Sequence, residues 1–324
     1  MLDVAAVPVK RVWVTGASGF VGSHLCRMAA ARGWAVLGSS RQPTTLKLPA
    51  GCQAIAHTQA VAGQGLGVLD AVIHVAARAH QLNDAAADPM AEFRAANVDA
   101  SLAVARAARE AGAGRFVYVS SIGVNGDSTQ GQPFRESDTP NPTEPYAVSK
   151  LEAEQVLREQ CTVLGMQLVI VRPPLVYGVG APGNFARLLK LARSGLPLPL
   201  AAVDNRRSFV AVQNLCDFLL CVAAHPAAAG ELFLIADGED LSTPQLLRVL
   251  AQALGAPSRL WALPPTLLRL SVSALGQRRI YDKLCGSLQV DASKARRLLG
   301  WNPSVSAVTG IADWAAQTLK RAGD

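Results

Sequence analysis

Two polar side chains in this sequence are spaced so that they could act on the same proton. Tyr146 and Lys150 end the run Tyr-Ala-Val-Ser-Lys, and a spacing of four residues places both on one face of a helix. A tyrosine phenol ordinarily ionises near pH ~10, and a neighbouring ammonium favours its phenolate. The pair is therefore a candidate for giving a proton to a substrate oxygen or taking one from it.

A glycine-rich segment near the N-terminus has the residues needed to bind a pyrophosphate. Residues 15–22 read Thr-Gly-Ala-Ser-Gly-Phe-Val-Gly, which follows an expected strand and opens an expected helix. The glycines permit a tight turn and a close approach of the backbone, and the helix N-terminus offers free N–H groups to phosphate. A glycine-rich structural turn is the alternative. The candidate cofactor-binding residues here are Gly16, Ser18, Gly19, Phe20, Val21 and Gly22.

The end of the second expected strand lacks the acidic residue that would bind the ribose hydroxyls of NAD. Ser39, Ser40 and Arg41 stand there instead. Two hydroxyls and a guanidinium can bind a 2′-phosphate, which an acid would repel. These residues favour NADP(H) over NAD(H), although Arg41 could instead cap the loop or stack on adenine and tolerate NAD(H).

Short apolar, β-branched runs alternate with longer segments of helical periodicity in the first half of the chain. This alternation predicts βαβ units and a doubly wound parallel α/β sheet, with ligand sites beyond the C-terminal ends of the strands. The expected strands are Arg11–Thr15, Ala35–Gly38, Ala71–Val75, Phe116–Ser120 and Leu168–Arg172. The expected helices are Phe20–Ala31, Met90–Ala111 and Tyr146–Leu164.

After Arg172 proline and glycine become frequent, and we expect a second domain. The dinucleotide-binding domain takes residues 1–172 and about 206–238, where the chain crosses back to the sheet. A smaller, mostly C-terminal substrate-binding domain takes about 173–205 and 239–324. Further helices are expected at 184–193, 213–224, 243–254, 265–275, 292–299 and 305–320, and strands near 208–212 and 232–235.

The composition argues against several other classes of protein. Half of the 324 residues are hydrophobic and the net charge is +7, which suits a globular chain that binds an anionic small molecule. Lys and Arg form no basic block, so we expect no nucleic-acid partner. The six cysteines show no CxxC spacing, which indicates a reduced, cytoplasmic protein without a metal site. No signal peptide is read, and prolines interrupt the apolar stretch 260–275, so we expect no membrane span.

Several motifs together resemble a known family. The glycine segment at 15–22, the Ser120-Ser121 pair at a strand end and the Pro-Tyr-Ala-Val-Ser-Lys run at 145–150 resemble the extended short-chain dehydrogenase/reductase family of nucleotide-sugar epimerases, dehydratases and reductases. Residues 207–214 and 291–295 are similar to two further segments of that family, so the resemblance covers essentially the whole chain. It implies a Rossmann-type sheet and supplies roles for single residues.

The resemblance implies a Ser/Tyr/Lys catalytic triad. Ser121 would bind the reacting oxygen of the substrate, Tyr146 would give or take its proton, and Lys150 would tune Tyr146 and hold the nicotinamide ribose. Ser120 would point to the other face of the strand, and Asn125 stands where the family has Tyr. Further cofactor-binding residues that the resemblance implies are Ala76, Ala77, Asn97 and Pro173. The substrate-binding residues that it implies are Ser121, Asn184, Arg207 and Arg279.

Three reactions share this machinery. A 4,6-dehydratase needs an acid and a base after Ser121, whereas Ile122 and Gly123 transfer no protons. A reductase that consumes NADPH at the C4 keto group of a UDP-linked 4-keto-6-deoxy-N-acetylhexosamine fits Arg41, and its product would be a precursor of surface polysaccharide such as O-antigen. A UDP-N-acetylhexosamine C4 epimerase with retained NAD is the alternative, and a non-catalytic dinucleotide-binding regulator is a more remote one. The family habit is a homodimer.

Overall fold

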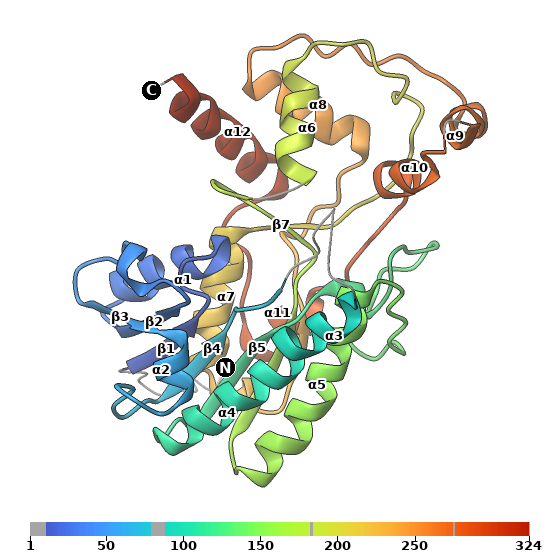
Figure 1. The fold of residues 1–324 in the computed structure, drawn as a ribbon. Coiled ribbons are helices and arrows are strands. Elements are labelled where there is room, and N and C mark those ends of the chain that lie inside the picture. Colours follow the sequence, from blue (N-terminus) through green and yellow to red (C-terminus); the bar gives the residue numbers. More distant parts are fainter. Residues whose placement is uncertain (1–10, 79–87, 182–183, 275, 324) are drawn as a thin grey trace.

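The centre of the protein is a parallel β-sheet. The computed structural model describes residues 11–78, 88–181, 184–274 and 276–323, and within them seven strands pair in the order β3-β2-β1-β4-β5-β6-β9 (Figure 1). Each neighbouring pair runs parallel. The strands are β1 (Arg11–Thr15), β2 (Ala35–Ser40), β3 (Cys52–Ala56), β4 (Ala71–His74), β5 (Arg115–Val119), β6 (Gln167–Arg172) and β9 (Leu232–Leu234). The prediction of a doubly wound parallel α/β sheet is confirmed.

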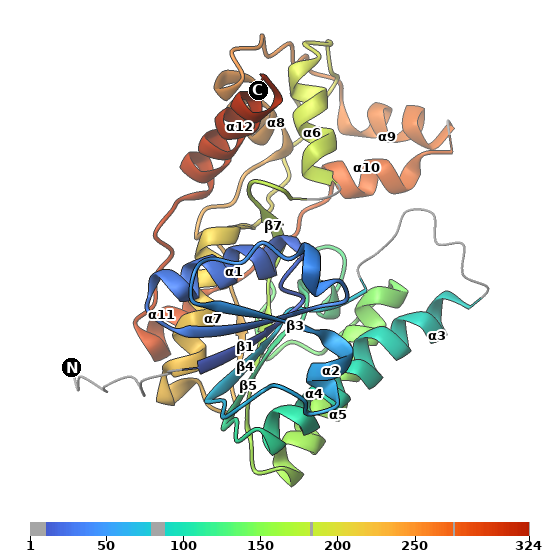
Figure 2. The same cartoon turned by 60° about the vertical axis from the view of Figure 1, so that its left-hand side comes forward.

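Helices cover both faces of the sheet, because successive strand residues point to opposite sides. Val12 and Val14 of β1 belong to one hydrophobic cluster, and Trp13 between them belongs to the other. Figure 2 shows α1 and α7 on one side of the sheet and α2, α4 and α5 on the other. Their bounds are α1 (Phe20–Ala31), α7 (Val212–Ala224), α2 (His57–Val61), α4 (Ala100–Glu110) and α5 (Pro145–Val163).

The strand order reverses at β1. This strand pairs with β2 on one side and with β4 on the other, so the chain winds outward in both directions from it. In open parallel sheets the crevice at such a point, beyond the C-terminal strand ends, is where ligands bind. The glycine segment after β1 and the loop after β4 border that crevice.

Most of the second half of the chain packs around a third hydrophobic cluster. Strands β7 (Leu175–Tyr177) and β8 (Phe209–Ala211) form a two-stranded parallel sheet there. Phe185 lies in this cluster, and its ring contacts those of Tyr177, Phe209 and Trp314. The cluster supports the expected substrate-binding domain, whose boundaries stay a prediction. The helices of this half are α6 (Asn184–Arg193), α8 (Thr243–Ala253), α9 (Pro265–Ala274), α10 (Arg278–Cys285), α11 (Ser293–Leu299) and α12 (Ala307–Gly323).

The segment expected as one helix over Met90–Ala111 is interrupted. Between α3 (Pro89–Arg94) and α4, the residues Ala95–Asp99 form a π-helical turn, η2. A π turn holds one more residue than an α turn and is frequent at functional sites. Here it carries Asn97 into the interior, where that residue is 1% exposed.

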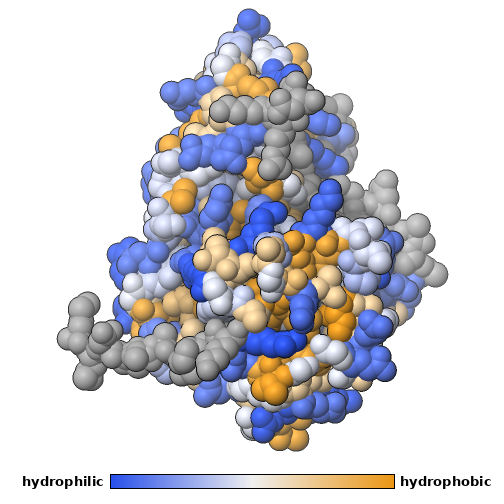
Figure 3. Space-filling model, turned by 90° about the vertical axis from the view of Figure 1, so that its left-hand side faces the viewer, coloured by the Kyte–Doolittle hydropathy of each residue, from blue (hydrophilic) through white to orange (hydrophobic). Residues whose placement is uncertain are grey.

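The strand β3 is absent from the strands expected from the sequence. It forms an edge of the sheet, and its five residues are partly or fully exposed. On the side of the molecule that carries this edge, apolar residues gather in the lower half and hydrophilic residues surround them (Figure 3). An edge strand of mixed polarity lacks the continuous apolar run by which buried parallel strands are recognised.

Three further observations bear on the choice among protein classes. Among the described helices, none is both long enough and apolar enough to cross a bilayer. The six cysteines are free thiols, buried or partly buried. In the described ranges, no group of His, Cys, Asp and Glu residues is arranged to hold a metal ion.

Candidate active site

The glycine segment connects β1 to α1, as the sequence predicts. Gly16 has a φ of +66°, and a Cβ added there would lie 2.9 Å from Cα of Ala76. A Cβ added at Gly22 would overlap the carbonyl oxygen of Gly16, so only glycine allows the helix to approach the loop so closely. Gly19 caps α1 without a side-chain hydrogen bond. The first-turn N–H groups of α1 therefore remain available to an anion, and this geometry fits a dinucleotide pyrophosphate.

Thr15 ties the glycine segment to the loop after β4. Its Oγ1 accepts hydrogen bonds from the N–H groups of Val75 at 3.2 Å and Ala76 at 3.1 Å. Ala76 packs against Gly16 as a result, and Ala77 follows it at the surface. The small side chains of these two alanines leave room beside the pyrophosphate loop.

The two serines at the end of β2 are held by different neighbours. Ser39 is fully buried, and its hydroxyl accepts a hydrogen bond from Nε1 of Trp13 at 2.9 Å. Ser40 donates to the hydroxyl of Ser18 at 3.0 Å, beside the glycine segment, and the exposed Arg41 follows it. The structure therefore brings Ser40 and Arg41 to the cofactor side, whereas Ser39 belongs to the core beneath it.

The three triad candidates come from two adjacent elements. Ser121 directly follows β5 and caps a short 3-10 turn, η3, with its side chain. Tyr146 and Lys150 lie in the first two turns of α5. The turn packs on that helix, since a Cβ added at Gly123 would lie 3.3 Å from Cβ of Ala147. The end of β5 and the start of α5 therefore meet, as the sequence requires for a shared site.

Asn97 and Pro173, two further cofactor candidates, contact the same elements. Nδ2 of Asn97 donates to the hydroxyl of Ser149 at 3.0 Å, and that hydroxyl donates to the carbonyl oxygen of Tyr146 at 2.8 Å. The carbonyl oxygen of Pro173 accepts from the N–H of Ile122 at 3.0 Å, in the turn that follows Ser121. The structure thus brings both residues to the triad.

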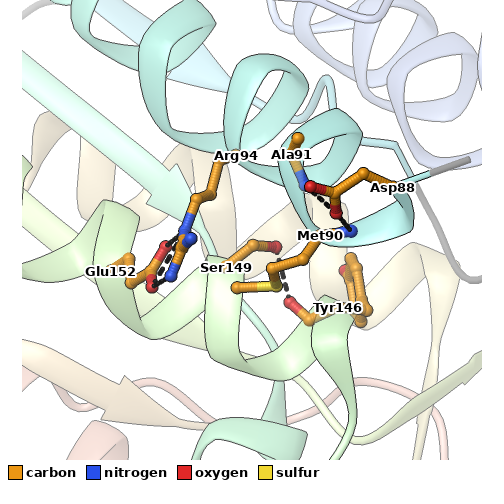
Figure 4. Close-up of polar contacts among 7 residues, drawn as sticks. All are labelled: Asp88, Met90, Ala91, Arg94, Tyr146, Ser149 and Glu152. Carbon is orange, nitrogen blue, oxygen red and sulfur yellow. Dashed lines mark hydrogen bonds and ion pairs between the residues drawn. The ribbon is translucent and has the colours of Figure 1, made fainter.

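Helix α3 is fastened to α5 beside Tyr146 (Figure 4). Asp88 caps α3 by accepting hydrogen bonds from two first-turn N–H groups at 3.0 Å. Arg94 donates to both carboxylate oxygens of Glu152, the shortest distance being 2.7 Å. Phe93 meets the Tyr146 ring edge-on, with centroids 6.2 Å apart. These contacts fix the direction of the Tyr146 side chain.

Burial dominates the acid–base properties of the two candidate proton carriers. It raises the pKa of Tyr146 to about 12 and lowers the pKa of Lys150 to about 7, although Glu154 opposes the latter shift. Tyr146 is therefore a protonated phenol at neutral pH, which is the state that donates a proton. Adding positive charge beside the phenol lowers its pKa and prepares the opposite transfer.

Sequence reasoning missed a buried polar network next to the triad. Ser120 donates to Glu154 at 2.5 Å, and Arg172 donates to both oxygens of the same carboxylate at 2.9 and 2.6 Å. Arg172 also donates to Asn125 at 2.8 Å, so the residue that departs from the family pattern has a structural partner. Glu154 lies four residues after Lys150 on α5, and this spacing is the signal that could have revealed it.

The expected substrate residues are only partly described. Nη1 of Arg207 donates to the carbonyl oxygens of Lys283 at 2.9 Å and Gly286 at 3.0 Å, at the end of α10. Lys283 in turn forms an ion pair of 3.0 Å with Glu144, directly before α5. Arg207 is therefore connected to the Tyr146 helix through α10. The side chains of Asn184 and Arg279 lie outside the described residues.

A parallel sheet with a glycine loop at its switch point, and a Ser/Tyr/Lys set at a neighbouring strand end, define a dinucleotide-dependent enzyme of the short-chain dehydrogenase/reductase class. The family model described as "NAD dependent epimerase/dehydratase family" matches residues 12–236, and the chain belongs to that family. The protein is thus an enzyme of the extended short-chain dehydrogenase/reductase type, and its family is NAD-dependent, as the sequence predicts.

Three relatives illustrate the range of this family. A UDP-glucose 4-epimerase of Vibrio cholerae is 35% identical over 317 residues, which cover 96% of both chains. A GDP-6-deoxy-D-mannose reductase of Pseudomonas aeruginosa is 30% identical over 75% of this chain and 79% of its own. The solved structure of a UDP-glucuronic acid 4-epimerase of Bacillus cereus in complex with NAD has a TM-score of 0.72, 22% identity, and coverage of 95% and 99% of the two chains. That structure confirms the fold.

Proposed function

We propose that the protein catalyses NAD(P)-dependent oxidation or reduction at C4 of a UDP-linked sugar, with Tyr146 as the proton carrier. The observation that carries the proposal is the meeting of α5 with the end of β5. There Tyr146, the buried Lys150 and Ser121 lie on adjacent elements at the C-terminal edge of the sheet. The crevice of the glycine segment borders the same edge.

Each residue has a defined task in this proposal. Ser121 donates a hydrogen bond to the reacting oxygen, and Tyr146 gives that oxygen a proton in reduction or takes one in oxidation. Lys150 contributes positive charge near the phenol and holds the nicotinamide ribose. The N–H groups at the start of α1 hold the pyrophosphate, and Ser40 and Arg41 hold the adenosine ribose. When bound, the nicotinamide supplies or accepts the hydride.

A UDP-sugar is the proposed substrate because several basic and amide groups surround the site. Arg207 would pair with the diphosphate, together with Asn184 and Arg279. The name of the Vibrio cholerae relative, a UDP-glucose 4-epimerase, supports UDP as the nucleotide. The product would serve as a precursor of surface polysaccharide.

The direction of the net reaction has two candidates, and each has an observation in its favour. The reductase of a UDP-4-keto-6-deoxy-N-acetylhexosamine is favoured by Arg41, which suits the 2′-phosphate of NADPH, and by the GDP-6-deoxy-D-mannose reductase among the relatives. The C4 epimerase with retained NAD is favoured by the 35% identity to a 4-epimerase over nearly the whole chain. A consumed cofactor separates the two.

Two other activities are less well supported. A 4,6-dehydratase needs proton-transferring residues after Ser121, and Ile122 and Gly123 of η3 provide none. A non-catalytic dinucleotide-binding regulator has no use for a proton carrier whose neighbour is a buried lysine. The combination of Tyr146 with Lys150 therefore favours an enzyme that turns over.

The experiment supplies the purified enzyme with two substrates in turn. Loss of NADPH absorbance in proportion to a UDP-4-keto sugar supports the reductase. Interconversion of UDP-GlcNAc and UDP-GalNAc without added cofactor supports the epimerase. Tyr146→Phe should abolish either activity and keep cofactor binding, whereas Tyr281→Phe, on the exposed side of α10, is the matched control. Full activity of Tyr146→Phe would refute the assigned role.

The assembly and the division of the chain are also part of the proposal. Residues 1–172 with about 206–238 would form the cofactor domain, and the third hydrophobic cluster supports a separate substrate domain. We expect a cytoplasmic homodimer, for which light scattering of the purified chain is the test. A monomer at micromolar concentration would contradict it.

A further inference from the structure

The ammonium of Lys150 is buried without a carboxylate of its own. Lys150 is 1% exposed, and within the described residues no ion pair joins it to an acid. The carboxylate of Glu154, one turn further along α5, is taken by Arg172 and Ser120. The contact that the ammonium does make is with an aromatic ring, since Nζ lies 4.2 Å from the ring centroid of Tyr118.

Tyr118 offers the face of its ring and not its hydroxyl. The residue is fully buried in β5, and within the described part of the chain its hydroxyl has no hydrogen-bond partner. A hydroxyl that bound Lys150 or a structural partner would make a hydrogen bond. The negative π face of the ring is therefore the part of Tyr118 that interacts with the cation.

His74 holds that ring in place. The two rings are nearly parallel, 14° apart, with centroids 5.9 Å from each other. His74 is itself fixed at both nitrogens, because Nδ1 lies 2.8 Å from the Thr15 hydroxyl and Nε2 lies 2.9 Å from the Ser101 hydroxyl. The stacked pair thus forms a rigid floor beneath Lys150.

The hydrogen-bond pattern keeps His74 uncharged. The Ser101 hydroxyl spends its proton on the carbonyl oxygen of Asn97 at 2.6 Å, so it accepts from Nε2–H of His74. Thr15 accepts two backbone N–H groups and has its own proton free to donate to Nδ1. One ring nitrogen therefore donates and the other accepts, which is the neutral imidazole. Burial and the charge of Lys150 lower the pKa of His74 in the same direction.

We infer that Tyr118 is a positioning residue for Lys150, whose ammonium it holds by the face of its ring while neutral His74 keeps the ring in plane. The inference deepens the proposed function, because Lys150 acts there on Tyr146 and the ribose. The Tyr118 ring substitutes for a counter-ion. A carboxylate in the same place would neutralise the charge that Lys150 contributes beside the phenol, whereas an uncharged ring does not.

The groups that face Lys150 define the expected electrostatic effect. They are Tyr146 and Glu154 on α5, Tyr118 on β5 and His74 on β4. Burial lowers the pKa of Lys150 to about 7, and the Glu154 carboxylate opposes this shift. The ring face also favours the charged form. Removing it should therefore lower the pKa of Lys150 further, by about one pH unit.

The test measures the ionisation of Lys150 directly. The chain has seven lysines, so the carbon-13 signal of each lysine side chain can be followed through a pH titration, with Lys150→Met to assign the one of interest. Tyr118→Leu should lower the pKa of Lys150 by about one unit, and Tyr118→Phe, which keeps the ring, should leave it at the parental value. An equal pKa in Tyr118→Leu and Tyr118→Phe would overturn the inference.

A second substitution covers the case in which Tyr118→Leu does not fold. A trifluorinated phenylalanine at position 118 keeps the size of the ring and weakens its negative face, so it should shift the titration in the same direction as leucine. The alkaline limb of the activity profile should move to lower pH by the same amount, whereas a merely structural role would reduce the rate equally at every pH. The titration needs no substrate, so it stands even if the proposed UDP-sugar activity is absent.

Discussion

Glu154 and Arg172 form an ion pair of 2.6 Å in which both side chains are almost completely buried, at 2% and 3% exposure. The pair joins α5, one turn beyond Lys150, to the last residue of β6. Because Ser120 donates to the same carboxylate, the end of β5 is held as well. The elements that carry Ser121, Tyr146 and Lys150 are therefore fixed to one another by a charged network that none of the triad residues enters.

Glu154→Gln should destabilise the protein strongly, because it leaves the Arg172 guanidinium buried and without its counter-ion. Breaking one partner of a buried pair typically costs about 3–5 kcal/mol. Urea unfolding measures the loss. Glu152→Gln breaks the exposed pair with Arg94 on the same helix and serves as the control, with a much smaller effect. Equal losses in the two variants would show that burial of the first pair does not matter.

The adjacent serines should separate cleanly. Ser121→Ala removes the proposed hydrogen bond to the reacting oxygen and should lower kcat about 100-fold with little change in unfolding free energy. Ser120→Ala removes the hydrogen bond to Glu154 and should cost about 1.5–3 kcal/mol of stability. Steady-state kinetics and urea unfolding on both variants check this. A larger loss of kcat in folded Ser120→Ala would reverse the assignment.

Gly22→Ala should abolish cofactor binding while the sheet remains folded. The added methyl group overlaps the Gly16 carbonyl oxygen, so α1 must move away from the pyrophosphate loop. Calorimetric titration with NAD(H) measures the affinity. Gly114→Ala places the same methyl group in open space and should bind as the parent does. Retained affinity in Gly22→Ala would mean that the loop does not bind the pyrophosphate.

Arg41→Asp should shift cofactor choice toward NADH. Losing a charge-assisted contact to the 2′-phosphate should lower the NADPH-to-NADH ratio of kcat/KM by about 10–100-fold. The same change of charge at Lys47, also exposed and six residues further on, controls for long-range repulsion. If Lys47→Asp and Arg41→Asp shift the ratio alike, Arg41 makes no direct contact.

Lys150→Met should stabilise the protein at neutral pH and less so in alkali. The pKa of Lys150 falls from 10.5 to about 7 on folding, so the unfolded chain binds more protons between these values. Its burial therefore costs stability in full below about pH 7, and the cost disappears as the pH rises towards 10.5. Unfolding at pH 6 and pH 10 measures the difference, expected to be a few kcal/mol. A gain equal at both pH values would contradict the shift.

The sequence predicts best where the local pattern decides the structure. The bounds of β1 and α1 agree with the expected Arg11–Thr15 and Phe20–Ala31, because an apolar strand, three glycines and a helix follow one another directly. The positions of Tyr146 and Lys150 on one helix follow from their spacing alone.

Contacts between distant segments account for what could not be predicted. Ser39 reads as a free hydroxyl, yet Trp13 of the neighbouring strand occupies it. Glu154 and Arg172 read as surface charges, and only their meeting across α5 and β6 makes them a buried pair. Such pairings depend on which strand lies beside which, and no local pattern contains that information.

The π-helical turn Ala95–Asp99 sets the rotation of everything after it on α4. An α-helix turns by about 100° per residue, so deleting one residue from this turn would rotate the rest of the helix by that angle relative to the sheet. Ser101 would leave His74, and Val104 would leave the core. The length of this segment is therefore as strictly constrained as the identity of Asn97, and changes in chain length there should be tolerated far less than substitutions.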